Sequence, residues 1–240
     1  MYKRIILKLS GETLAPLEYD PNTHTSPVFD ARRIDAAADI IVRLANRGVQ
    51  LGIVLGGGNI WRGRFTDTMD PVQADQMGML ATIINALAFQ EAIIRAGKEA
   101  VVYTPQKMDR FTDHYRADKA IRDMEAGRVV LLAGGSGNPF FTTDTAAALR
   151  AAELKADAVF KGTTVDGLYD ADPRKVPTAK LLPDITYQEA IDRGLRVMDL
   201  TAFQLCMEQN IPAIRIFSMA NLENILLVAE GDPRGTVVHP

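Results

Sequence analysis

The chain has 240 residues, of which 47% are hydrophobic and 24% are charged, a composition typical of a globular protein with a sizeable core. Its 27 basic and 30 acidic residues give a formal net charge of −3, so no bulk positive field would hold a nucleic acid or a membrane surface. The single cysteine, Cys206, excludes an intrachain disulfide and a cysteine metal cluster, and it fits a reducing compartment, by default the cytoplasm.

Short apolar runs of strand length alternate along the chain with longer segments of helical periodicity. The runs that predict strands are residues 5–9, 49–55, 100–103, 129–133, 158–160 and 213–217. The segments that predict helices are residues 31–47, 72–96, 118–126, 145–155, 187–193, 201–209 and 222–229. This alternation indicates the α/β fold class, with a mainly parallel central sheet and helices on both faces. Because no flexible linker divides the chain, we expect residues 1–240 to form a single domain.

The longest predicted helix, residues 72–96, has apolar residues at three- and four-residue spacings, which indicates one apolar stripe. The stripe consists of Met77, Leu80, Ala81, Ile84, Leu87, Ala88 and Ile94. We expect no membrane span, since no stretch reaches the 18 or so uncharged apolar residues that one needs, and residues 1–10 lack the features of a signal peptide. Two long irregular segments, residues 15–27 and 166–183, interrupt the pattern, and loops of this length are usually functional lids or disordered excursions.

Three glycine-rich segments directly follow predicted strands. They are residues 8–12 (KLSGE), 56–59 (GGGN) and 134–139 (GGSGNP). The carboxyl ends of parallel strands form the ligand-binding edge of such sheets, where glycines leave backbone N–H groups open to a polyanion. Each segment alone could be an ordinary tight turn, but three together predict a phosphate site. The chain contains neither GxxxxGK[ST] nor a GxGxxG between strand and helix, which excludes a P-loop enzyme and a simple dinucleotide binder.

Charged residues beside these loops suit phosphoryl transfer, which needs positive groups around the moving phosphoryl group. Lys8 and Lys161 each lie within or at the end of an apolar strand, and Arg62 follows the triple glycine. The alternatives are an edge-strand lysine for Lys8 and a solvated surface arginine for Arg62. Asp144 stands just ahead of the predicted helix 145–155, where it could cap the helix, or organise the lysines or magnesium, or do both.

Hydrolase chemistry finds little support in the sequence. The three histidines, His24, His114 and His239, have no HxxxH spacing, and GxSxG is absent. A phosphate monoester acceptor would need no general base, because its second pKa near 6 leaves it anionic at neutral pH. A kinase that phosphorylates nucleoside monophosphates can therefore work without a histidine.

At this point the sequence resembles the amino acid kinase superfamily and, within it, the bacterial-type UMP kinases, over essentially residues 2–238. The first and third glycine-rich segments, residues 8–12 and 134–139, mark the superfamily broadly, and residues 56–59 with Arg62 also match. The segments 75–82 (DQMGMLAT) and 137–144 (GNPFFTTD) are specific to UMP kinases. Further matching segments are residues 161–163 (KGT), 165–169 (VDGLY), 171–173 and 197–200 (VMDL).

The resemblance implies transfer of a phosphoryl group from ATP to UMP with Mg²⁺, on a three-layer αβα fold assembled as a homohexamer. It implies ATP-phosphate contacts from Lys8, Leu9, Ser10, Gly11, Gly58 and Arg62, and contacts with the nucleoside end of ATP from Thr163, Tyr169 and Asp172. It implies a UMP site made of Gly57, Asp75, Ser136, Gly137, Asn138, Pro139, Phe140, Phe141, Thr142 and Thr143. Lys8 and Lys161 would stabilise the moving phosphoryl group, Asp144 would organise them, and Arg62 completes the expected catalytic set. No residue is expected to be a dedicated metal ligand.

The segment after KLSGE departs from the family, because many bacterial members carry a shorter, glycine-rich stretch there that is associated with activation by GTP. In this chain residues 13–27 are longer and contain no glycine, which puts GTP activation in doubt. Inhibition by UTP, competing at the UMP site, is expected from the resemblance. Two other hypotheses stay open: a superfamily kinase acting on a small carboxylate or another phosphate monoester, and a non-catalytic relative that binds nucleotides or oxoanions.

Overall fold

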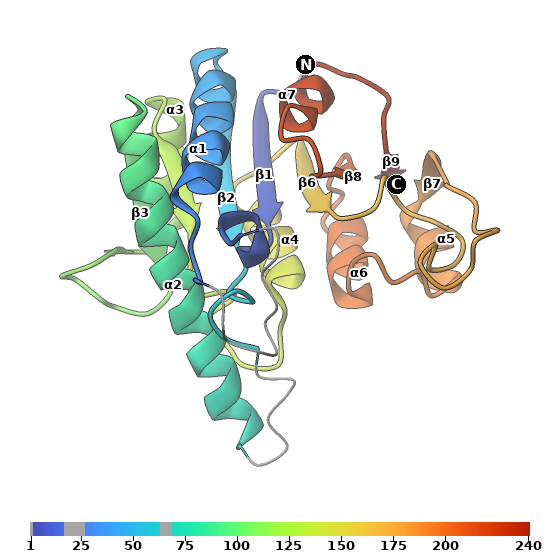
Figure 1. Cartoon of the computed structure of the whole chain (residues 1–240), viewed down its shortest axis with the longest axis horizontal. Coiled ribbons are helices and arrows are strands. Elements are labelled where there is room, and N and C mark those ends of the chain that lie inside the picture. Colours follow the sequence, from blue (N-terminus) through green and yellow to red (C-terminus); the bar gives the residue numbers. More distant parts are fainter. Residues whose placement is uncertain (1, 17–26, 63–68) are drawn as a thin grey trace.

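In this computed structural model, which describes residues 2–16, 27–62 and 69–240, a single sheet runs through the molecule (Figure 1). The described residues form nine strands, of which β1 (Arg4–Leu9) is the central one, with β6 (Ala158–Thr163) beside it. The strand order is β4 (Asp113–His114), β3 (Ala100–Thr104), β5 (Val129–Leu132), β2 (Gln50–Leu55), β1, β6, β8 (Ile214–Ser218), β9 (Thr236–His239) and β7 (Asp184–Thr186). Of these neighbours only β8 and β9 pair antiparallel, which confirms the mainly parallel sheet.

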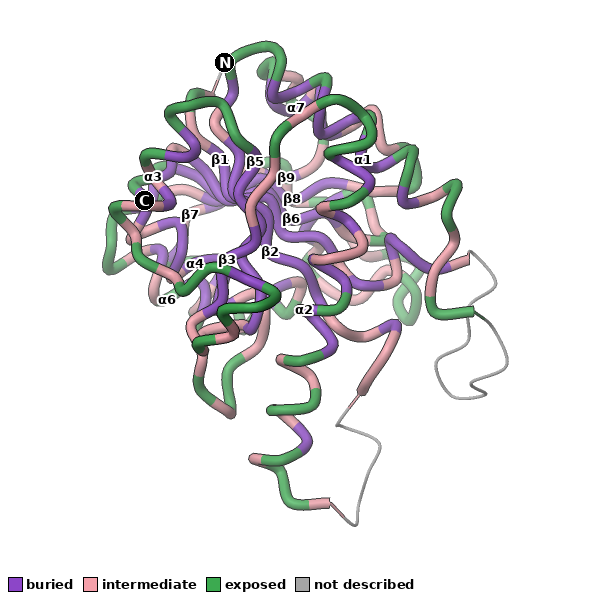
Figure 2. Tube along the Cα trace, turned by 90° about the vertical axis from the view of Figure 1, so that its left-hand side faces the viewer, coloured by how far each residue is buried: buried purple, intermediate pink, exposed green. Residues whose placement is uncertain are grey.

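Helices cover both faces of the sheet, which confirms the three-layer αβα arrangement (Figure 1). One face carries α1 (Ala31–Asn46), α2 (Pro71–Arg95) and α7 (Asn224–Ala229), and the other carries α3 (Ala117–Glu125), α4 (Thr143–Glu153), α5 (Tyr187–Asp192) and α6 (Leu200–Glu208). A short 3₁₀ helix, η1 (Gly11–Leu14), follows β1. The buried strands lie between the two core layers (Figure 2).

All the predicted strands and helices are present, with ends that differ by at most three residues. Four further elements, η1, β4, β7 and β9, are not predicted by the sequence pattern, because each has only two to four residues and is too short for a hydrophobic pattern to identify. In the segment 166–183 the structure has only an isolated bridge between Tyr169 and Leu181, as expected of an irregular segment. Most of the other irregular segment, residues 17–26, lies outside the described residues.

The apolar stripe predicted for α2 is buried only in part: Ala81 is buried, whereas four of its larger members are exposed. Met77, Leu80, Ile84 and Ile94 are 39%, 51%, 48% and 53% exposed. The helix packs on the sheet through another apolar face, which shares only Ala81 with the predicted stripe and whose buried members are Ala74, Ala81, Ile83, Ala86, Phe89, Ala92 and Ile93. Its N-terminal half projects beyond the body of the fold (Figure 2).

Helix α2 is also long and apolar enough, by length and composition, to cross a membrane, contrary to the expectation that no stretch is. It is the one helix with this property in the described part of the chain. Within its most apolar stretch 44% of the residues are buried in the fold, and a single helix of this kind is weak evidence for a membrane span.

Candidate active site

Two lysines lie side by side in the middle of the sheet. Lys8 on β1 and Lys161 on β6 are partners in the register of these parallel strands. Leu7 and Leu9 pack in the core layer that contains α1, so the alternation along β1 turns Lys8 toward the opposite layer, where α4 lies. The interpretation of Lys8 as an edge-strand lysine is therefore wrong, because β1 lies between β2 and β6.

Asp144 in the first turn of α4 joins the two lysines. Lys8 Nζ lies 3.1 Å from Asp144 Oδ1, and Lys161 Nζ donates to the same oxygen at 2.5 Å. None of the three side chains is more than 13% exposed. Burial opposes ionisation of Asp144, but the charges of Lys8 and Lys161 outweigh it and hold the pKa of this carboxyl below its ordinary value. Burial, together with repulsion from Lys8, lowers the pKa of Lys161 to about 8.

The start of α4 fixes the position of Asp144. Its N-cap is Thr142, whose Oγ1 accepts from Asp144 N at 3.1 Å, so the interpretation of Asp144 as the cap is wrong. The Asp144 carboxylate is thereby left for the lysines. The Thr142 hydroxyl also donates to Asp199, as does Thr145 Oγ1 at 2.9 Å. Asp199 caps α6 through Ala202 N at 2.7 Å, and so it joins the starts of two helices, a role that the sequence analysis did not assign.

A buried pair of asparagines holds the glycine loop that follows β2. Asn85 Nδ2 on α2 donates to Gly56 O and to Asn59 Oδ1, both at 2.7 Å. Gly57 lies so close to α2 that a Cβ atom on it would meet Gly78 O at 2.9 Å, which explains the need for glycine there. Neither asparagine is among the residues predicted for the site, although Asn85, a polar residue inside the apolar pattern of α2, is a signal for such a contact.

Arg62 and Glu12 connect the loops that follow β2 and β1. Arg62 Nε donates to Gly58 O at 3.0 Å, and its guanidinium also pairs with the Glu12 carboxylate. Burial opposes ionisation of Glu12, but hydrogen bonding and the charge of Arg62 hold its pKa below the ordinary value. Arg62 is 35% exposed, and its guanidinium contacts both Gly58 O and the Glu12 carboxylate, so it is not the freely solvated surface arginine of the alternative interpretation.

One cavity of about 630 Å³ lies where the loops after β1, β2 and β5 meet one face of α2. Its lining includes these candidates: Lys8, Ser10, Gly11, Gly57, Gly58, Arg62, Asp75, Ser136, Asn138, Phe140, Phe141, Thr142 and Thr143. Asp75 Oδ2 accepts from Phe140 N at 2.7 Å, which ties α2 to the segment 136–143. The three glycine-rich segments therefore converge at the sheet edge, as the sequence predicts.

Other candidates lie outside this cavity. Thr163, Tyr169 and Asp172 line a second cavity of about 450 Å³ in the segment that follows β6. Asp144 lines a further hollow of about 540 Å³. This hollow shares Lys8, Thr142 and Thr143 with the cavity of about 630 Å³. The candidates Leu9, Lys161, Gly137 and Pro139 line none of these spaces. Leu9 is buried in the core, so only its backbone could meet a ligand.

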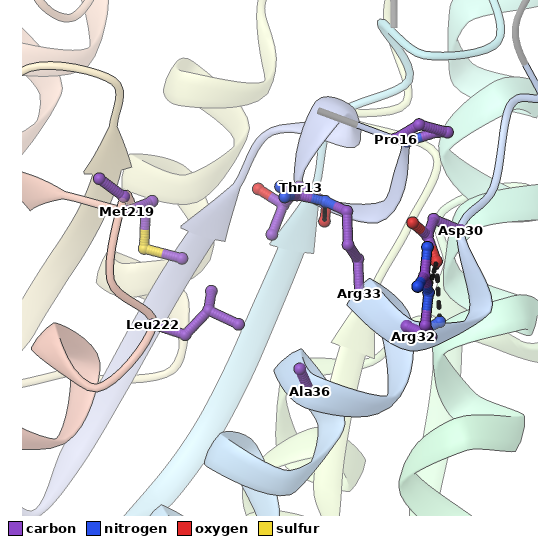
Figure 3. A pocket seen from close by; sticks show the side chains of 9 residues that line it. Thr13, Pro16, Asp30, Arg32, Arg33, Ala36, Met219 and Leu222 are labelled. Carbon is purple, nitrogen blue, oxygen red and sulfur yellow. Dashed lines mark hydrogen bonds and ion pairs between the residues drawn. The ribbon is translucent and has the colours of Figure 1, made fainter. Parts of the chain in front are cut away.

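A hollow of about 650 Å³ lies between η1, the start of α1 and the loop after β8 (Figure 3). Its lining contains Arg32, Arg33 and Met219 but none of the candidate residues. Arg33 Nε donates to Thr13 O at 3.3 Å, and Asp30 caps α1 by accepting from Arg32 N at 2.9 Å. These polar groups thus serve the local fold.

No group of three or more His, Cys, Asp or Glu side chains suited to a metal ion occurs in residues 2–16, 27–62 and 69–240. Asp144 is the carboxylate nearest the lysines, and both of them engage it. A magnesium ion at this site would therefore take most of its ligands from a bound phosphate and water, as is usual for this ion.

The model of the amino acid kinase family matches residues 3–218. The chain belongs to the amino acid kinase family. Among family members, the uridylate kinase of Bacteroides thetaiotaomicron is 48% identical, with 99% of this chain and 98% of that protein covered. The uridylate kinase of Parabacteroides distasonis is likewise 48% identical over the same shares of the two chains.

Solved structures of amino acid kinase family members have the same fold. The UMP kinase of Bacillus anthracis superposes with a TM-score of 0.92 at 30% identity, covering 99% of this chain and 96% of that chain. The UMP kinase of Ureaplasma parvum superposes with a TM-score of 0.90 at 34% identity, with both chains fully covered.

Proposed function

We propose that the chain is a UMP kinase, which reversibly transfers the γ-phosphoryl group of ATP to UMP in pyrimidine nucleotide biosynthesis. The observation that carries this proposal is the cavity in which Lys8 and the loops after β1 and β2 meet the segment 136–143. Uridylate kinases that match the chain over almost its whole length support the assignment of this activity.

The chemistry of the Lys8, Asp144 and Lys161 cluster suits this reaction. An oxygen of the UMP phosphate attacks the γ-phosphorus of ATP, the bond from that phosphorus to the bridging oxygen breaks, and ADP leaves. The two ammonium groups stabilise the charge on the oxygens in transfer. Because the UMP phosphate is already anionic, no general base is needed. The lowered pKa of Asp144 and its contacts with both lysines suit a positioning role.

Two sets of residues would hold the donor nucleotide. The loops that contain Ser10, Gly11 and Gly58 offer backbone N–H groups to the ATP phosphates, and Arg62 adds a guanidinium. The second cavity, with Tyr169 and its neighbours Thr163 and Asp172, has room for the nucleoside end of ATP. Magnesium would arrive on the ATP phosphates and neutralise part of their charge, and no step requires a dedicated protein cage for it.

Asp75 and the segment 136–143 would bind UMP. Asp75 Oδ2 already accepts from Phe140 N, which leaves Asp75 Oδ1 for a ribose hydroxyl. Backbone and hydroxyl groups along the segment can pair with the uracil ring and the phosphate. UTP, which carries the same nucleoside, would compete at this site and inhibit the enzyme. Activation by GTP is not part of this proposal, because residues 13–27 are longer than the glycine-rich stretch of many family members and contain no glycine.

We also propose that the chain acts as one domain in the cytoplasm and assembles as a homohexamer. A continuous sheet that supplies both nucleotide sites supports the single domain. The exposed apolar stripe of α2, Met77, Leu80, Ile84 and Ile94, is a surface that a second copy could cover. Cys206 is buried, and burial raises its thiol pKa to about 12, so it suits a reducing compartment as an inert core residue.

A panel of acceptors tests the proposed activity. Phosphoryl transfer from ATP is measured with UMP, CMP, glutamate and carbamate as acceptors, and then with UMP in the presence of UTP or GTP. We expect a clear preference for UMP and competitive inhibition by UTP. Equal rates with all four acceptors, or a preference for a carboxylate, would contradict the proposal and favour a different kinase of the same family.

A further inference from the structure

The glycine loop after β5 forms one wall of the cavity. Gly134, Gly135 and Gly137 have φ angles of 77°, 62° and 91°, all in the left-handed region. Such a backbone has little conformational preference of its own, so other parts of the molecule must fix its shape. Gly135, Ser136 and Asn138 line the cavity, and the backbone N–H groups of Gly135 and Ser136 have no partner within the described residues. These N–H groups are therefore available to a ligand.

Two buried side chains hold the first half of this loop. Thr82 Oγ1 on α2 accepts from Gly134 N at 2.8 Å. Arg150 on α4, which is 4% exposed, donates to Gly135 O at 3.4 Å. The loop is thus held from both layers of helices.

Gln106, just after β3, holds the second half of the loop. Its Nε2 donates to Gly137 O at 3.3 Å and lies 3.8 Å from the sulfur of Met79. The contact is close, since a Cβ atom on Gly134 would lie 2.8 Å from Gln106 Oε1. Neither Gln106 nor Gly137 lines the cavity, so this hydrogen bond lies behind the loop, away from a ligand.

The carbonyl oxygen of the Gln106 amide lowers the stability of the fold. Gln106 Oε1 is buried and has no hydrogen-bond partner among the described residues. Turning the amide over would set its oxygen against the carbonyl of Gly137, so the present orientation is the one that holds the loop. A side chain that leaves a buried acceptor unpaired in order to bind one carbonyl is better explained by function than by stability.

We infer that Gln106 is a positioning residue for the acceptor nucleotide, a pyrimidine nucleoside monophosphate. By holding the Gly137 carbonyl behind the loop, it keeps the N–H groups of Gly135 and Ser136 directed into the cavity. This inference rests on the proposed UMP kinase function. It concerns binding of the acceptor, because Gln106 touches neither the Lys8, Asp144 and Lys161 cluster nor the cavity near Tyr169.

The test is the variant Gln106→Met, which keeps the length of the side chain but removes the donor. Losing one hydrogen bond that orients the loop should raise KM for UMP about 5- to 10-fold. We expect kcat and KM for ATP to change less than about twofold, with an unfolding temperature no lower than that of the wild type. Gln90→Met is the matched control, because Gln90 Nε2 also donates to a backbone carbonyl, Ala100 O at 3.0 Å, away from the cavity. Its kinetic constants should equal those of the wild type.

An unchanged KM for UMP in Gln106→Met would overturn the inference. Equal increases of KM for UMP and KM for ATP in Gln106→Met, or the same increases in Gln90→Met, would overturn it as well. If Gln106→Met does not fold, calorimetric titration of Gln106→Leu with UMP gives the same comparison. If the wild type phosphorylates UMP and the Gln106 variant has the same KM for UMP, only the role of Gln106 is refuted. A wild type that neither binds nor phosphorylates UMP refutes the proposed function as well.

Discussion

The buried cluster of Lys8, Asp144 and Lys161 sets two ammonium groups against one carboxylate. Uncompensated buried charge is costly, and an anionic ligand would offset it. The depressed pKa of Lys161 reports this cost, because burial and the charge of Lys8 both favour the neutral amine. The same burial and repulsion that disfavour the charged form of Lys161 thus favour the binding of anionic phosphates.

The lowered pKa of Lys161 predicts how kcat/KM for ATP depends on pH. Because the pKa of Lys161 is lowered to about 8, raising the pH through that value removes its charge, and kcat/KM for ATP should fall. The free energy of unfolding changes in the other direction: it rises as the pH increases from about 8 toward the ordinary lysine pKa of 10.5, because in that range Lys161 binds fewer protons in the folded state than in the unfolded chain. The measurement is kcat/KM for ATP against pH, with circular dichroism to show that the fold persists. A flat profile up to pH 10 would remove Lys161 from the cationic set.

At the scale of elements, the start of α4 determines whether the site is assembled. Thr142 caps this helix and binds Asp199 at the start of α6, so a single hydroxyl links two helices to the segment 136–143. Asp144 follows within the first turn. A change in the orientation of α4 would therefore move the Asp144 carboxylate away from Lys8 and Lys161.

Replacing Thr142 with valine tests this link. Loss of a threonine N-cap lowers the free energy of unfolding by about 1 kcal/mol, and Thr142→Val should also lower kcat, because α4 carries Asp144. Thr186 caps α5 by accepting from Glu189 N at 3.2 Å and is the matched control. Thr186→Val should cost a similar amount of stability without changing kcat. Equal kcat values for the two variants in steady-state assays would show that the cap of α4 does not position the site.

At the scale of the whole molecule, the fold brings residues from Lys8 to Asp172 to one edge of one sheet. Apolar runs and glycine-rich segments predicted this architecture and the convergence of the loops, because both are local patterns. The contact of Lys8 with Lys161 depends on which strands are neighbours, and the sequence does not give that order directly. The roles of Asp199 and Gln106 depend on contacts between distant segments for the same reason. Helix α2 has two apolar faces, and periodicity alone could not tell which one packs on the sheet.

The exposed face of α2 makes a prediction about assembly. If a second copy covers it, Ile84→Glu places a charge in the contact and should shift the protein to a smaller species in analytical ultracentrifugation. Val176→Glu is the control, because Val176 is an exposed apolar residue in the irregular segment 166–183, away from α2. An unchanged sedimentation coefficient for Ile84→Glu would mean that copies associate through another surface or not at all.

The central claim is that the lysine cluster transfers a phosphoryl group from ATP to UMP. The most direct measurement follows label from [γ-³²P]ATP into UDP with the wild type, Lys8→Ala and the control Lys3→Ala, whose altered side chain lies on the surface. We predict labelled UDP with the wild type and Lys3→Ala, and a rate about 10²- to 10³-fold lower with folded Lys8→Ala. No labelled UDP with the wild type, or an undiminished rate with Lys8→Ala, would contradict the account.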